Sequence, residues 1–107
     1  MTTFDKREEA FEKQFALDEE HKFKAQARRN RLLGLWAAEQ LGKSGEDASA
    51  YAKEVIAAEF EDARDAAVVR KVAADLSAKG IAISDAEILA RMDEFMLQAV
   101  AQVKAGL

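Results

Sequence analysis

Residues 32–38 read LLGLWAA, the longest stretch of the chain without a charged or polar side chain. In a helix this run places apolar groups on every face, which is the pattern of a helix that is buried all round. The surrounding composition favours helices as well, because there is no proline and alanine, glutamate, lysine, arginine and leucine dominate. No alternating apolar and polar run is long enough to indicate a sheet. We therefore expect residues 32–38 at the centre of an all-α core.

On both sides of this run, the apolar residues recur with helical spacing and glycines mark the breaks. We predict helices over 4–41, from Gly45 to a break near 62–65, from there to Gly80, and from Ser84 towards the end of the chain. The connections are short, so the sequence predicts a single four-helix bundle. Its core should come from residues 32–36 and from the aromatic, valine and aliphatic stripes of the later helices, which include Tyr51, Phe60, Val68, Val69, Val72, Leu76, Ile88, Met92 and Val100.

The boundary between the last two helices carries the clearest local signals. Gly80 occupies the place of a left-handed residue after a helix, and Ile81 can then fold back on Leu76, as in a Schellman motif. Ser84 and Glu87 have the spacing of a capping box at the start of the next helix. We therefore expect one helix to end just before Gly80 and another to begin just after Ser84.

The N-terminal end of the first helical stretch differs from the rest. A helix over residues 4–41 would exceed about 50 Å, longer than a globule of this size can cover. From residue 4 to residue 15 its apolar side is only a narrow stripe, formed by Phe4, Phe11 and Phe15. Such a short helix is marginal in water on its own. We predict that residues 1–17 form a mobile amphipathic extension of the first helix and that residues 18–107 form the bundle. The extension either folds back on the bundle or folds on a partner.

The basic side chains gather in one block. Residues 21–43 carry six basic and one acidic side chain, although the whole chain has a net charge of −4. Three interpretations of this block remain open: a solvated helix face, a docking surface for an acidic protein, or an anion site for a nucleotide. The candidate anion or nucleotide contacts are Lys22, Lys24, Arg28, Arg29 and Arg31.

The chain lacks the residues that several classes of function require. There is no cysteine, a single histidine (His21) in a charged segment, and no glycine-rich phosphate loop. We therefore expect no catalytic site, no metal site, no cofactor and no enzyme activity. The acidic balance disfavours nucleic acid, and no apolar stretch approaches the length of a membrane span. The charged N-terminus is not a signal peptide, so we expect a cytoplasmic protein.

The chain also resembles a known family. Residues 4–42, and above all the run ARRNRLLGLWAAE at 27–39, look like the opening of the zeta subunit, the small inhibitor of the F-type ATP synthase in alphaproteobacteria. The similarity continues more weakly through 51–55 and 69–76. Two departures are visible. This chain carries Leu17 and His21 where the family often has the two residue types in the opposite order, and residues 61–67 lack the glycine-containing acidic turn of the family.

This resemblance implies a four-helix bundle whose N-terminal segment inserts at a catalytic interface between alpha and beta subunits, near the gamma subunit of the rotor stalk. There it would block ATP hydrolysis, and the bundle would remain outside. The free protein would be a monomer, and the bound one would sit at the inner face of the bacterial membrane. Weak binding of an adenine nucleotide at 22–31 is the alternative function. The residues expected to contact the enzyme are Phe4, Arg7, Glu8, Phe11 and Phe15.

Overall fold

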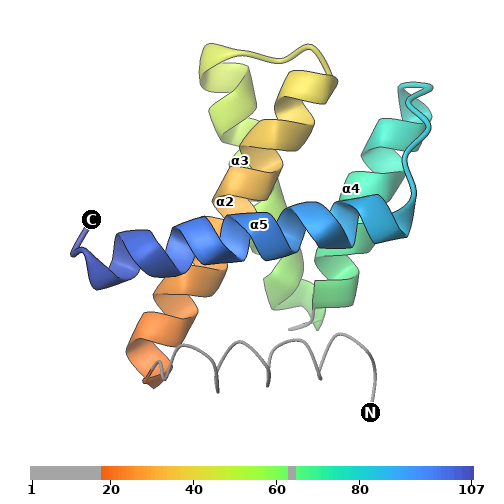
Figure 1. Cartoon of the computed structure of the whole chain (residues 1–107). Helices are drawn as coiled ribbons and strands as arrows, with labels where there is room; N and C mark the ends of the chain where they lie inside the picture. The colour runs from red at the N-terminus through yellow and green to blue at the C-terminus, as the bar shows by residue number, and fades with distance from the viewer. Residues whose placement is uncertain (1–17, 63–64) are drawn as a thin grey trace.

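The computed structural model describes residues 18–62 and 65–107, and over these ranges the chain forms four helices and no strand. The predicted all-α fold is therefore confirmed. The helices and their bounds are α2 (Glu19–Gln40), α3 (Gly45–Asp62), α4 (Asp65–Ala78) and α5 (Asp85–Lys104). In Figure 1, α2 and α3 run side by side from the turn that joins them, and α4 flanks α3.

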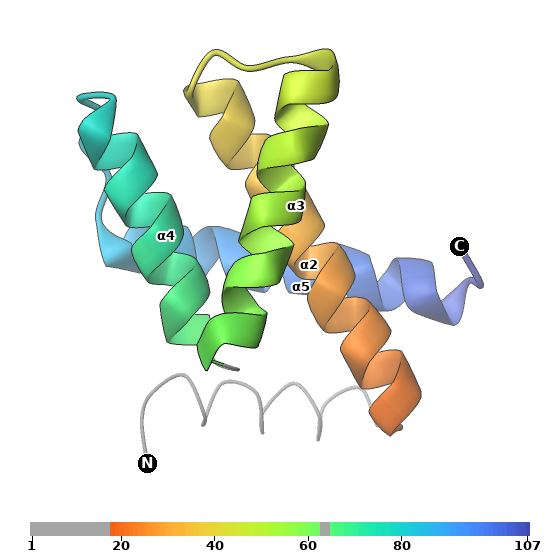
Figure 2. The same ribbon diagram turned by 180° about the vertical axis from the view of Figure 1, so that it is seen from behind.

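Helix α5 lies across α2 instead of alongside it, and Figures 1 and 2 agree on this arrangement. The reason is the length of its apolar stripe. Ile88 and Met92, near its start, belong to the main core with α2, α3 and α4, whereas Met96, Val100 and Val103 form a second buried cluster with Ala25 of α2. The last helix therefore closes the bundle by crossing the others, so it is not an antiparallel neighbour.

The apolar run at 32–38 lies at the centre of the fold as predicted. None of its seven residues is exposed, and Leu33, Ala37 and Ala38 are fully buried. Gly34 faces α3 so closely that a Cβ atom added there would lie 2.7 Å from the Cα of Ala52. A side chain at position 34 would therefore force the two helices apart.

The local signals around residues 76–87 were predicted correctly. The Ile81 amide donates to the Leu76 carbonyl at 2.9 Å, and Gly80 has a φ of 82°, which together make the Schellman motif. The Ser84 side chain accepts from the Glu87 amide at 3.1 Å and caps α5. The expected break near 62–65 is also present, between the end of α3 and the start of α4.

The first helix of the described residues, α2, begins at Glu19. Asp18 has an extended backbone (φ −75°, ψ 172°), and its side chain accepts from the His21 amide at 2.8 Å as the N-cap of α2. This hydrogen bond lowers the pKa of the Asp18 carboxyl. The expected helix over 4–41 is therefore interrupted at Asp18. The predicted enzyme-contacting residues lie outside the described ranges: Phe4, Arg7, Glu8, Phe11 and Phe15.

Phe60 corrects one expectation about the core. It was expected to be buried with the other aromatic residue of its helix, yet 83% of its surface is exposed, whereas Tyr51 is buried. Phe60 lies in the last turn of α3 beside the half-buried Ile56, where both line a surface groove. The helical spacing correctly indicated an apolar side of α3. It could not show that no described helix covers this side at the C-terminal end of α3.

Candidate functional site

The predicted basic site does not form one surface, because α2 carries its cations around its circumference. Arg29 is 2% exposed and points into the protein, whereas Arg31 is exposed. Lys24 is exposed and lies 3.4 Å from Glu20 in an ion pair. Arg28 is half-buried and donates to the Gln102 side chain of α5 at 3.1 Å. The fifth member of the set, Lys22, is half-buried.

Arg29 is the centre of a buried polar cluster that joins three helices. Its guanidinium donates to both carboxylate oxygens of Asp65 on α4, at 2.8 and 3.1 Å. It also donates to Glu59 of α3 at 3.1 Å and to the neighbouring Asn30 side chain at 2.9 and 3.1 Å. Asn30 in turn donates to Glu59 at 2.8 Å. The Arg29 guanidinium therefore binds side chains of the protein itself, and the structure gives this residue a role in packing.

The cluster holds one cation and two carboxylates, so its charges do not cancel when both carboxylates are ionised. Burial, opposed by the charge of Arg29 and reinforced by the proximity of Asp65, raises the pKa of Glu59 to about 7. Asp65 is 3% exposed and makes the bidentate contact with the Arg29 guanidinium. Glu59 therefore exchanges a proton near neutral pH.

Two of the predicted anion contacts do share one hollow. His21, Lys24 and Arg28 line a cavity of about 430 Å³ together with C-terminal residues that include Val103 and Leu107. The cavity lies where the first half of α2 meets the end of α5. It brings basic side chains to an apolar wall, which is a suitable arrangement for an anion that carries an aromatic ring.

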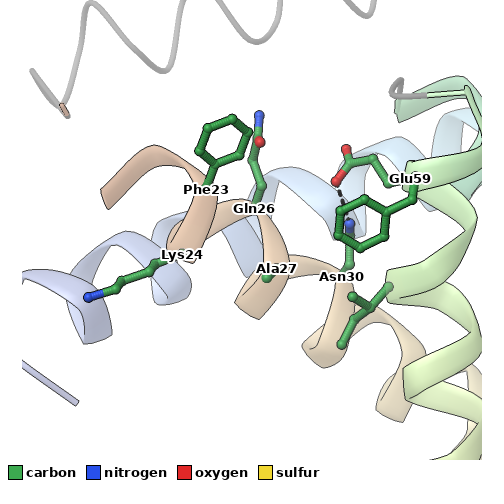
Figure 3. A pocket seen from close by; sticks show the side chains of 8 residues that line it. Phe23, Lys24, Gln26, Ala27, Asn30 and Glu59 are labelled. Carbon is green, nitrogen blue, oxygen red and sulfur yellow. Dashed lines mark hydrogen bonds between the residues drawn. The ribbon is translucent and has the colours of Figure 1, made fainter. Parts of the chain in front are cut away.

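A second hollow is an apolar groove between α2 and α3. It has a volume of about 490 Å³ and is lined by Phe23, Lys24, Gln26, Ala27, Asn30, Ile56, Glu59 and Phe60. Figure 3 shows Phe23 and Gln26 on the same side of α2, with Lys24 pointing away from them. Phe23 and Phe60 are 64% and 83% exposed. Phe23 was not among the predicted site residues, although its position between Lys22 and Lys24 indicates an exposed aromatic side chain.

A polar cluster on the other side of α3 has a structural role. The Tyr51 hydroxyl donates to Asp75 of α4 at 2.7 Å, and Lys71 bridges Asp75 and Glu54 at 3.0 and 3.2 Å. Burial and the Asp75 carboxylate raise the pKa of Tyr51. Within residues 18–62 and 65–107, no group of three or more histidine, aspartate and glutamate side chains is placed to hold a metal ion.

Comparisons with known proteins place this structure in a family. The model of the family described as ATPase inhibitor subunit zeta matches residues 1–102. The chain belongs to this family. It is also 50% identical to a solved solution NMR structure, over 80% of this chain and 98% of that one, with a TM-score of 0.70. The comparison with curated proteins finds no match. The resemblance stated from residues 4–42 is thereby confirmed for nearly the whole chain.

Membership of the zeta family supports an inhibitory role in general and association with the ATP synthase. The family match begins at residue 1, so it includes the segment before Asp18 as well as the four helices. No helix in the described ranges is long and apolar enough to span a membrane.

Proposed function

We propose that the protein is a non-enzymatic inhibitor of ATP hydrolysis by the F-type ATP synthase. The observation that carries this proposal is the match of the ATPase inhibitor family to residues 1–102, which covers both the N-terminal segment and the bundle. In this proposal the partners are the alpha and beta subunits at a catalytic interface and the gamma subunit of the rotor. The bound protein then sits on the cytoplasmic side, at the inner face of the bacterial membrane.

The proposed mechanism gives the N-terminal segment the inhibitory contact. Phe4, Phe11 and Phe15 share one helical face and would anchor a helix in a groove of the enzyme. Arg7 and Glu8 would set register and specificity more than affinity. A helix with so narrow an apolar stripe gains too little alone to offset its ordering entropy, so a partner surface must supply the rest. In this proposal the bundle that follows Asp18 would remain outside the groove and act as the stop.

The test measures ATP hydrolysis by the isolated bacterial enzyme at increasing concentrations of the inhibitor. We compare the full chain, a chain lacking residues 1–17, and the variant Phe11→Ser. Loss of one anchor that behaves as a hot spot should weaken inhibition about 30-fold. The matched control is Leu97→Ser, which removes an exposed apolar residue of α5 and should inhibit like the parent. Circular dichroism checks that every variant keeps its helices.

The outcomes separate function from mechanism. Inhibition by the parent and not by the shortened chain supports both. Equal inhibition by the two chains contradicts the role of residues 1–17, and no inhibition by either contradicts the proposed function itself.

A second candidate function is the binding of an adenine nucleotide, and the hollow lined by His21, Lys24 and Arg28 favours it. Of the five predicted contacts in 22–31, Lys24 and Arg28 line this hollow, while Arg29 is turned inward. The test is an ATP titration followed by amide chemical shifts. We expect shifts centred on Lys24 and Arg28 that are lost in Arg28→Ser. Their absence at millimolar nucleotide would exclude this function.

A further inference from the structure

The groove between α2 and α3 has the apolar lining of a docking site. Its opposite edges carry Phe23 of α2 and Phe60 of α3, both largely exposed, with Ala27 and Ile56 between them. Two of the four large apolar side chains that are exposed in the described ranges therefore lie at this one groove. Exposed apolar surface that is gathered in one place marks an interaction site more often than scattered residues do.

The polar groups at this groove are already bound. The Asn30 amide donates to Glu59 at 2.8 Å, and both also bind Arg29, as described above. Figure 3 shows this hydrogen bond beside the groove, and Lys24 points away from Phe23 and Gln26. The groove therefore presents mainly apolar atoms, and its occupant should be a row of apolar side chains with polar groups only at the margins.

We infer that residues 1–17 of the same chain occupy this groove in the free protein, with the stripe of Phe4, Phe11 and Phe15 packed against Phe23 and Phe60. We call this arrangement the latch. It goes beyond the proposed function, because it concerns the protein before it meets any partner.

The connection along the chain is the first argument for this occupant. The described chain starts at Asp18, and Phe23 follows it by five residues in the first turns of α2, a rise of about 7.5 Å. The segment of residues 1–17 would measure about 25 Å as a helix and more when extended. It therefore reaches the groove without any rearrangement of the bundle. A short connection of this kind gives an effective concentration on the order of millimolar, which no separate partner matches at ordinary concentrations.

The pattern of the segment is the second argument. Its three phenylalanines are spaced seven and four residues apart, so they share one face of a helix, and ten of the other fourteen residues of the segment are polar or charged. This matches a groove that is apolar inside and open to solvent along its length. A second copy of the chain offers the same stripe, but it lacks the advantage of being tethered.

The latch would regulate access to the phenylalanine stripe. A docked segment is unavailable to a partner, so the apparent affinity for that partner falls in proportion to the undocked fraction. The contact is small, so a partner that binds the stripe more tightly can displace it.

The test uses the full chain, which has no cysteine, so a single Thr3→Cys substitution accepts one nitroxide label. The measurement is paramagnetic broadening of NMR signals in the free protein. We expect the signals of Ile56 and Phe60 to lose most of their intensity, and those near Gly80 to keep theirs. In the labelled variant with Phe4→Ser, Phe11→Ser and Phe15→Ser, the signals of Ile56 and Phe60 should recover.

Two further samples complete the design. The paired substitution Phe23→Ser with Phe60→Ser removes the edges of the groove and should also restore the signal of Ile56. Both substituted residues are exposed, so the fold is not at risk. Leu97→Ser is the control and should leave the broadening unchanged. Equal broadening in the parent and the stripe variant would overturn the latch, since it would reflect the tether alone.

The remaining alternative occupant is a second copy. It is tested by mixing isotope-labelled protein without nitroxide and nitroxide-labelled protein without isotope. Broadening of Ile56 and Phe60 in this mixture would assign the groove to another molecule and overturn the latch. None of these measurements involves the ATP synthase, so failure of the latch and failure of the proposed function are distinguishable.

Discussion

Arg29 places a charge in the interior of a protein of only 107 residues, and Asp65 is the group that compensates for it. The pair is 2% exposed on both sides, and its geometry is bidentate. Buried pairs of this kind add little net stability compared with apolar residues, but breaking one by removing a single partner leaves an uncompensated charge. The contact between Arg29 and Asp65 therefore fixes the position of α4 against α2.

The first prediction compares two arginines of α2. Arg29→Ala should lower the free energy of unfolding by roughly 3–5 kcal/mol, because it leaves Asp65 buried without its cation. The matched control is Arg31→Ala, an exposed residue two positions away, for which the change should stay within about 0.5 kcal/mol. Urea unfolding followed by circular dichroism measures both. Equal effects would show that the cluster does not support the fold.

Gly34 acts through the lack of a side chain. A Cβ at this position would lie 2.7 Å from the backbone of Ala52, so α2 and α3 would have to separate. We predict that Gly34→Ala destabilises the protein, because overpacking costs roughly 1–3 kcal/mol while the gain in helix propensity is at most about 1 kcal/mol. Thermal unfolding measures the change, and a higher melting temperature than the parent would contradict the prediction.

At the scale of helices, Glu59 connects α3 to a cluster shared by α2 and α4. It faces Arg29 and Asn30 from α2 and Asp65 from α4. Its side chain is 18% exposed, so water reaches it only in part. The joint between these three helices therefore contains a carboxyl group that titrates near neutral pH.

This arrangement predicts a pH dependence with a definite sign. The pKa of Glu59 is about 7 in the folded protein and 4.5 for an ordinary glutamate. Between these values the folded state binds more protons than the unfolded state, so this group makes stability fall as the pH rises from about 5 to 8. The stabilising contribution of Glu59 is fully present below its pKa in the unfolded state and is lost above its pKa in the folded state.

The variant Glu59→Gln removes this titration. We expect its free energy of unfolding, relative to the parent, to improve by about 1–2 kcal/mol between pH 5 and pH 8, after allowance for solvent screening. Urea unfolding at the two pH values measures the difference, and Glu54→Gln, on the exposed part of α3, is the control. A relative stability that stays constant with pH would show that Glu59 is ionised throughout.

At the scale of the whole molecule, the structure combines a closed core with one open apolar groove. The core runs from α2 to both ends of α5, whereas the groove lies at the end of α3 beside the start of α2. The latch would fill the groove within one molecule and leave little apolar surface for self-association. The net charge of −4 opposes association as well.

The protein should therefore be a monomer when free. Sedimentation velocity should give a mass near 11.8 kDa that does not change with concentration. A dimer that dissociates on dilution and is lost in Phe60→Ser would contradict this prediction and would place a second copy in the groove.

Local sequence signals predicted the all-α class, the boundary between α4 and α5, and the family, but not the start of α2 at Glu19. The run at 32–38, the Schellman glycine Gly80 and the cap Ser84 act within a few residues of themselves, so their outcome does not depend on distant parts of the chain. The similarity across 4–42 predicted the family, because such a similarity depends only on the order of the residues and not on the fold.

Only the tertiary structure decided which members of each pattern are buried. Arg29 and Arg31 differ by two positions in one basic run, yet one binds Asp65 in the interior and the other is exposed. Phe60 and Tyr51 lie on one helix, yet α4 provides a partner for Tyr51 and no described helix covers Phe60. Helical spacing determines which side of a helix a residue lies on. Whether that side is buried depends on which other helix packs against it, and this is decided by the tertiary structure.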